Sequence, residues 1–284
     1  MQSFLLDMPS AQININNSIT ERTMAIMYID NSIIINFLND NDDYKNHWLF
    51  THILPDRTFT FSQPKQIDKK DISVLYHTMI EHLHNFTPYN HSIIEKLFPN
   101  WKTMLSSLNV ILAIGCPPPY DAMTRTYQEK EYIIFDLVRF LDYQKQGYDI
   151  FSIIMTMITH EFIHICIHND YPCTSNHYVD KLKYIVFDEG FAHLLSFQNN
   201  IFQYDFASVK EKYYHSSLIQ LQQALLETSP AAQSQYLESS NTGNYWDKFG
   251  AISGKLYLSD HLKQLHHIYR AGVDDMLQNM LHNI

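Results

Sequence analysis

The spacing of apolar residues predicts strands in the first half of the chain. Two β-branched and aromatic runs, 24–30 and 32–38, are separated by Asp30-Asn31 and predict a strand pair joined by a turn. The apolar run 109–115, which precedes three successive prolines, predicts a buried strand. Two further segments are also rich in strand-forming residues, 58–61 and 131–141.

Helical spacing dominates the second half of the chain. Between 71 and 86 it predicts a helix whose inner side carries Val74, Leu75, Thr78, Met79 and Leu83. Other helices are predicted at 44–54, 93–108 with a break at Pro99, 150–168, 178–197, 206–227, 230–237, 245–267 and 269–281. These elements predict an α+β fold: an N-terminal lobe, 1–148, with a small mixed or antiparallel sheet, and a mainly helical lobe, 149–284, that together form one catalytic unit.

The most apolar predicted helix contains the pattern His-Glu-x-x-His, formed by His160, Glu161 and His164. Residues four apart lie on one helix face, so the two imidazoles can bind a single metal ion, with Glu161 about 100° round the helix beside them. With 16 histidines in the chain, the pattern has a chance expectation of about 0.03 occurrences. The apolar residues around it predict a buried helix, in which these polar groups need partners.

A second segment, Phe187-Asp188-Glu189-Gly190-Phe191-Ala192, lies on the next predicted helix. Together with the His-Glu-x-x-His pattern it resembles the gluzincin metallopeptidases, over residues 150–197. The resemblance implies a zincin-like fold and one Zn²⁺ per chain, with His160, His164 and Glu189 as metal ligands. It further implies that Glu161 is the general base of peptide-bond hydrolysis.

Two features depart from members of that family. The thermolysin-like pattern has an aspartate four residues after the ligand glutamate, where it orients a zinc-binding histidine, but this chain has His193 there. The aminopeptidase branch has an upstream Gly-x-Met-Glu-Asn loop that this sequence lacks, which favours an endopeptidase. Asp188 and His193 compete with Glu189 for the metal, although Asp188 is expected to orient a ligand, and His168 is expected to have a supporting or core role.

The resemblance also implies a tyrosine or histidine that stabilises the oxyanion. Tyr245 is the candidate, with His261 and His266 as alternatives. In the family, the strand before the zinc helix is a sheet edge that pairs with an extended substrate, which implies this role for 131–141. An ordinary sheet strand or the start of a helix is the alternative for that segment.

Glycines within the predicted helices indicate close packing. Gly190 is unfavourable inside a helix by about 1 kcal/mol relative to alanine, which indicates a close backbone approach beside the metal site. The Gly250-x-x-x-Gly254 spacing likewise indicates tight helix packing.

Composition restricts the partners. A net charge of −10 and scattered basic residues argue against nucleic acid. The first residues lack a secretory signal and no apolar run approaches the length of a membrane span, so we expect a cytoplasmic protein without a membrane partner, although signal-independent export stays open. Three cysteines favour a reducing compartment. The expected partner is a protein or peptide substrate, and the oligomeric state is open.

Three hypotheses follow. The first is a zinc-dependent endopeptidase, either a housekeeping peptidase or a narrowly specific toxin or effector. The second is a catalytically inactive protein of the same fold, in which zinc is structural or the cleft binds a partner. The third is a chance motif without metal. A structural zinc site does not require Glu161, so its presence favours the enzyme.

Overall fold

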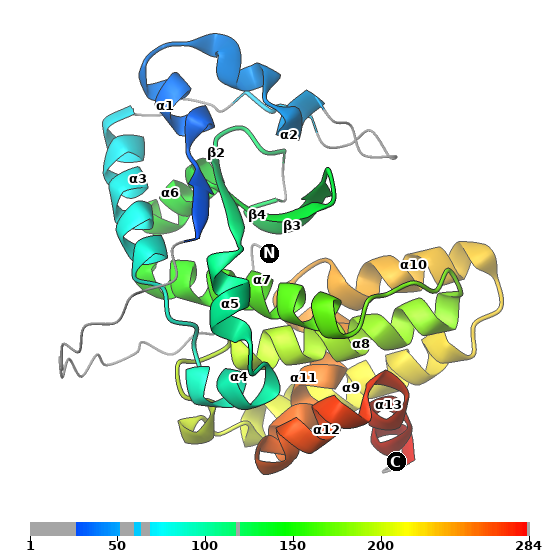
Figure 1. The fold of residues 1–284 in the computed structure, drawn as a ribbon. Coiled ribbons are helices and arrows are strands. Elements are labelled where there is room, and N and C mark those ends of the chain that lie inside the picture. Colours follow the sequence, from blue (N-terminus) through cyan, green and yellow to red (C-terminus); the bar gives the residue numbers. More distant parts are fainter. Residues whose placement is uncertain (1–26, 52–59, 64–68, 118–119, 283–284) are drawn as a thin grey trace. The chain divides into compact units, whose positions relative to one another are not determined.

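The computed structural model describes residues 27–51, 60–63, 69–117 and 120–282, which form two compact units (Figure 1). The C-terminal unit consists of Thr87–Trp101 and the chain from Met155 onward. The N-terminal unit consists of the described residues up to Phe86 and of Lys102–Ile154. The segment Thr87–Trp101 lies within the predicted N-terminal lobe, yet it belongs to the C-terminal unit.

A four-stranded mixed sheet lies in the N-terminal unit and has the order β1-β2-β4-β3. Strands β1 (Tyr28–Asp30), β2 (Asn109–Ala113) and β4 (Lys130–Asp136) are parallel. Strand β3 (Ala122–Tyr127) is antiparallel to β4 and forms one edge. With helices forming most of the described chain, the predicted α+β class is confirmed.

The prediction of a strand at 32–38 is wrong, because this segment is the helix α1 (Ser32–Leu38). Asp30 starts the helix by accepting a hydrogen bond from the Ser32 amide at 2.9 Å. Ile33 and Ile34 are fully buried while Ile35 is 40% exposed, which is the pattern of a helix that packs one face on β2 and α3. Tertiary packing therefore overrides the strand preference of the isoleucines.

The role implied for 131–141 is also wrong. Strand β4 pairs with β2 on one side and β3 on the other, so it is an inner strand and cannot pair with a substrate strand. It ends at Asp136, whose Oδ1 accepts hydrogen bonds from the amides of Val138 and Arg139 and thereby caps α6 (Leu137–Lys145). The cap turns the second half of the apolar run into a helix.

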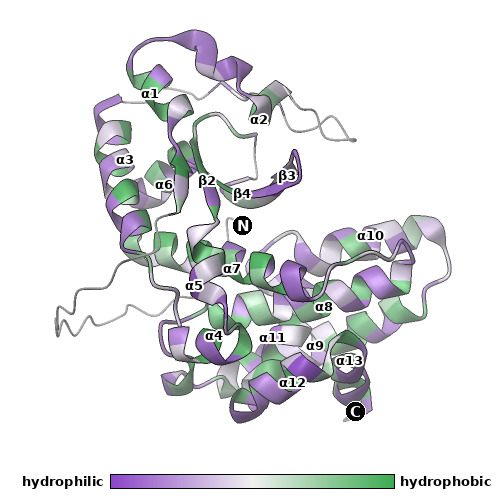
Figure 2. Cartoon of the chain, in the orientation of Figure 1, coloured by the Kyte–Doolittle hydropathy of each residue, from purple (hydrophilic) through white to green (hydrophobic). Residues whose placement is uncertain are grey.

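The sequence did not predict the edge strand β3. Its connection to β4 is a two-residue turn, Gln128-Glu129, in which both residues have left-handed φ angles of 48° and 62°. Asn-Gly or Asp-Gly is the usual sequence of such a turn, so the local signal was missing. The tip of this hairpin is hydrophilic, as its purple colour in Figure 2 shows.

The helix α3 (Lys69–His84) confirms the prediction for 71–86. Its inner side carries Ile72, Leu75, Met79 and Leu83, whereas Val74, predicted on that side, is 58% exposed. For the predicted helix 44–54, residues 52–54 lie outside the described residues, and the rest forms a 3₁₀ helix, η1 (Asp42–Asn46), followed by the short α2 (Trp48–Thr51). For the predicted strand 58–61, residues 58 and 59 lie outside the described residues, and 60–61 are not in a strand.

The described part of the C-terminal unit contains helices and no strands. The helix α10, for example, carries both hydrophilic and hydrophobic residues (Figure 2). Pro99 separates α4 from α5, as predicted, and the predicted helix 245–267 is broken near His261. The α-helices of this unit are α4 (His91–Leu97), α7 (Ile150–Asp170, whose first turn belongs to the N-terminal unit), α8 (Tyr178–Leu195), α9 (Ala207–Leu225), α10 (Pro230–Asn241), α11 (Phe249–Asp260), α12 (Leu265–Ala271) and α13 (Val273–His282). The helix α5 (Trp101–Ser106) belongs to the N-terminal unit except for Trp101. The 3₁₀ helices are η2 (Ile201–Gln203), η3 (Tyr245–Asp247) and η4 (Leu262–Gln264).

Glycines allow α8 and α11 to pack with their backbones almost in contact. A Cβ atom added to Gly254 would lie 2.2 Å from the carbonyl oxygen of Val186, and one added to Gly190 would lie 2.9 Å from the Gly254 backbone. A Cβ at Gly250 would lie 2.9 Å from Ser240. The close packing predicted for these glycines is confirmed.

Asn90, which lies in the segment Thr87–Trp101, holds the chain at and after the end of α8 through hydrogen bonds. Its Nδ2 donates hydrogen bonds to the carbonyls of Leu195 and Gln198 at 2.8 and 2.6 Å, and its Oδ1 accepts one from the Ile201 amide at 2.9 Å. The neighbouring Tyr89 amide donates to Thr159 Oγ1 on α7 at 3.1 Å. The segment 87–101 is thus tied to both helices that carry the predicted metal ligands.

Within the described residues, α7 is long and apolar enough to cross a membrane by length and composition. However, 89% of its most apolar 18-residue window is buried inside the protein. A core helix of a globular protein passes the same test, so this property is weak evidence for a membrane span.

Candidate metal centre

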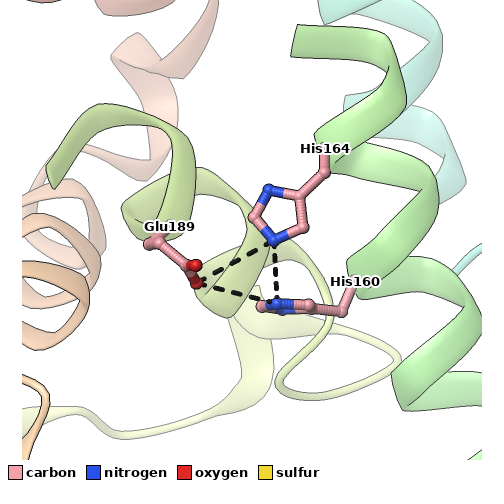
Figure 3. Close-up of side chains that lie close together, drawn as sticks. All are labelled: His160, His164 and Glu189. Carbon is pink, nitrogen blue, oxygen red and sulfur yellow. Dashed lines mark hydrogen bonds and ion pairs between the residues drawn. The ribbon is translucent and has the colours of Figure 1, made fainter. Parts of the chain in front are cut away.

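Three side chains predicted to bind metal converge between α7 and α8. His160 and His164 project from successive turns of α7, and Glu189 projects toward them from α8 (Figure 3). The Nε2 atoms of the two histidines are 3.0 Å apart. Glu189 Oε2 lies 3.7 Å from His160 Nε2 and 3.9 Å from His164 Nε2.

Nε2 of His160, Nε2 of His164 and Oε2 of Glu189 form a triangle whose size and chemistry fit a metal ion. Ligands about 2.0–2.1 Å from a tetrahedral ion are about 3.3 Å from one another, and the three observed separations, from 3.0 to 3.9 Å, bracket this value. Two imidazole nitrogens and one carboxylate oxygen are donors that transition metals accept. The three residues can therefore hold a metal ion.

The pKa values of the two histidines are shifted in opposite directions. Burial, aided by the charge of His164, holds the pKa of His160 well below its usual value. Burial also opposes a charge on His164, but the carboxylates of Asp188 and Glu189 outweigh it and raise the pKa of His164 to about 10. The two Nε2 atoms lie within hydrogen-bond distance of each other, at 3.0 Å.

Asp188 orients His164. Its Oδ1 accepts a hydrogen bond from His164 Nδ1 at 2.9 Å, and both side chains are largely buried. The other oxygen, Oδ2, lies 3.4 Å from Nε2 of His168, one turn further along α7. By contrast, the buried Nδ1 of His160 has no hydrogen-bond partner within the described part of the chain. A carboxylate thus fixes only one of the two candidate histidine ligands.

His193 lies beside the triangle rather than in it. It is buried, its ring centre is 4.7 Å from that of His160, and its Nε2 is 3.3 Å from Glu189 Oε2. Burial lowers the pKa of His193 to about 4, so its imidazole is neutral at neutral pH. The 3.3 Å contact places the His193 ring against the Glu189 carboxylate, beside the three candidate ligand atoms.

Glu161, the predicted general base, is buried on α7 next to His160. Its charge is one of those that raise the pKa of His164, which is consistent with a carboxylate close to the centre. The residues of the His-Glu-x-x-His pattern therefore occupy one buried stretch of α7, as the sequence predicts.

Tyr245 is buried and packs behind His193, with ring centres 5.1 Å apart. Its hydroxyl accepts a hydrogen bond from Lys255 Nζ at 2.7 Å. Among the interactions described for Tyr245, none is with the three donors of the triangle. Neither alternative is brought to the centre within the described residues: His261 Nδ1 bonds the Tyr257 carbonyl at 2.8 Å, and His266 is exposed.

Several polar residues near the centre had no signal in the sequence. Lys248 and Lys255 are buried, although lysine is rarely buried, and the charge of Lys248 lowers the pKa values of His160 and His193. Asn241 Nδ2 donates to Glu189 Oε1 at 3.4 Å. Their positions depend on how α10 and α11 pack on α8, which local sequence does not specify.

Comparisons with known proteins give no relative. Compared with protein-family models, with curated proteins and with solved structures, the chain matches none of them. Any function assigned to the centre therefore depends on its own geometry and chemistry.

Proposed function

We propose that the protein is a zinc-dependent metallopeptidase, an endopeptidase of gluzincin type that hydrolyses a protein or peptide substrate. One observation carries the proposal: His160, His164 and Glu189 form a largely buried triangle of metal-ligand spacing, and Glu161 follows His160 directly on α7. Two imidazoles and one carboxylate are the ligand set of several catalytic zinc sites, and zinc binding would displace a proton from His164 Nε2. A structural zinc site has four protein ligands, so a group of three candidate ligands within the described residues favours catalysis.

The proposed reaction is hydrolysis of a peptide bond. Zinc would supply a Lewis acid that polarises a carbonyl group and lowers the pKa of a water molecule. Glu161 accepts the proton of the attacking water and delivers it to the leaving amine. Asp188 and His193 act on the ligands, because they hold His164 and Glu189 in place.

Metal content tests the proposal. The purified protein is compared with Glu189→Ala and with Glu211→Ala, a control at an exposed position of α9, by elemental analysis after reconstitution with zinc. About one zinc per chain is expected in the parent and the control, and much less in Glu189→Ala. A parent chain that binds no zinc would overturn the proposal.

Cleavage tests the enzyme hypothesis separately. The zinc-loaded protein is incubated with a peptide library prepared from a digested proteome, and new peptide ends are identified by mass spectrometry. Cleavage that requires zinc and is absent from Glu189→Ala is expected. Bound zinc without any cleavage would favour the inactive protein of the same fold.

A further inference from the structure

His164, Asp188 and His168 form a chain of contacts from the metal centre toward the protein surface. Asp188 uses one carboxylate oxygen for each histidine: Oδ1 lies 2.9 Å from His164 Nδ1, and Oδ2 lies 3.4 Å from His168 Nε2. The side chains of His164 and Asp188 are each 10% exposed, and that of His168 is 34% exposed. The imidazole rings of His164 and His168, which lie four residues apart on α7, are 26° from parallel.

We propose that Asp188 and His168 are positioning residues that set the affinity of the centre for its metal. Asp188 fixes the ring of His164, and His168 fixes the carboxylate of Asp188. The inference rests on the proposed function only to the extent that the centre binds zinc, and it does not depend on peptide cleavage.

The geometry explains why a carboxylate held at both oxygens is effective. Rotation of the Asp188 carboxylate would break both contacts, so His168 limits the orientations open to it. A carboxylate on the far nitrogen of a metal-binding imidazole fixes the ring and increases the basicity of the ligating nitrogen. Because His160 Nδ1 has no such partner within the described residues, Asp188 is the carboxylate on which the histidine pair depends.

Asp188 is adjacent in sequence to a candidate metal ligand. It immediately precedes Glu189 on α8, so one turn of this helix supplies both a candidate ligand and the residue that orients another. Position 193, where the thermolysin-like pattern has its orienting aspartate, is instead a histidine that contacts Glu189.

The same atoms could also hold a second metal ion, because His164, His168 and Asp188 form a cluster of potential ligands. The 2.9 Å separation of His164 Nδ1 and Asp188 Oδ1 is also that of a charge-assisted hydrogen bond, so the two uses compete for the same atoms. The Nδ1 atom cannot donate that hydrogen bond and bind a metal at the same time. The number of zinc ions bound per chain separates the two uses.

Zinc affinity tests the inference, measured by competition with a chelator of known affinity. Asp188→Asn is expected to weaken binding by about 10–100-fold and His168→Ala by a smaller factor. If His168 acts through Asp188, the variant that combines Asp188→Asn with His168→Ala should bind zinc no more weakly than Asp188→Asn alone. His215→Ala, at an exposed position of α9, is the control and keeps the parent affinity.

The visible spectrum of the cobalt-substituted protein gives a second readout, because it reports the ligand geometry and would not change through stability alone. A changed spectrum is expected for Asp188→Asn. Unchanged affinity in both single variants, additive losses, or loss of a second equivalent of zinc in His168→Ala would each overturn the inference. These outcomes leave the proposed function intact, whereas a parent protein without zinc would overturn both.

Discussion

The Nε2 atom of His193 lies 3.3 Å from Oε2 of Glu189, one turn along the same helix. An aspartate at position 193, as in the thermolysin-like pattern, would place a second carboxylate beside Glu189 in a buried site. The neutral imidazole avoids this repulsion and contacts the carboxylate that the metal would bind.

We therefore expect His193→Asp to be more destabilising than His193→Gln, which keeps an N–H donor. The difference in the free energy of unfolding should be about 3 kcal/mol or more, the usual effect of an uncompensated buried charge. Urea unfolding in the presence of a chelator measures it without a contribution from metal. Equal stabilities of the two variants would contradict the role of His193 as a donor to Glu189.

Glu161→Gln separates metal binding from catalysis. The substitution removes the proton acceptor and keeps the shape of the side chain, so zinc should bind at the parent stoichiometry. Cleavage of a peptide identified from the library should slow by about 10²–10⁴-fold, the range for loss of a general base. Unchanged cleavage would show that Glu161 does not have this role.

Gly254→Ala tests the close contact of α8 and α11. The added Cβ would lie 2.2 Å from the Val186 carbonyl, so the helices must move apart, and overpacking of this kind destabilises by about 1–3 kcal/mol or more. Because α8 carries Glu189, zinc affinity should fall as well.

Gly147→Ala is the control for this prediction. Its Cβ meets no atom within 4 Å, but its φ angle of +85° disfavours alanine. It should lower stability through the backbone alone and leave zinc affinity unchanged. A Gly254→Ala protein with the parent stability and affinity would contradict the described packing.

The burial of Lys255 leads us to expect that the free energy of unfolding depends on pH. It is fully buried, with Nζ 3.2 Å from the centre of the Phe197 ring, and burial holds its pKa well below the usual value. The folded protein therefore releases this proton at a lower pH than the unfolded chain, which binds it below about pH 10.4. Because the unfolded state binds more protons, the contribution of Lys255 to stability increases as the pH rises toward that value.

The measurement compares the parent with Lys255→Met at pH 7, 8 and 9. The stability of the parent relative to the variant should increase with pH, by at most about 1.4 kcal/mol per pH unit, and groups common to both proteins cancel. Lys263→Met, at an exposed lysine, should show no such slope. A constant difference for Lys255→Met would mean that the buried amine is charged in the folded protein.

Periodic apolar residues predicted the long helices of this fold well. They located α3, α7, α8 and α9, and the apolar run ended by prolines located β2. The errors arose where local preference and tertiary packing disagree. The isoleucines of α1 favour a strand but pack as a helix, and the turn before β4 lacks the usual residues.

For the candidate centre, helical spacing placed His160 and His164 together, and the family resemblance added Glu189. The structure brings these three together as the resemblance implied. The contact of His168 with Asp188 and the burial of Lys255 could not be predicted, because they depend on the rotation and spacing of α7, α8 and α11 after packing.

The assignment of Thr87–Trp101 to the C-terminal unit has a consequence for dissecting the protein. The chain passes between the units at Phe86, Trp101 and Ile154, so no single cut separates them. A fragment that begins at residue 149 loses Asn90, and with it the donors to the carbonyls of Leu195 and Gln198 that follow the Glu189 helix. The C-terminal unit can be isolated intact only if the segment 87–101 is joined to it, for example by circular permutation.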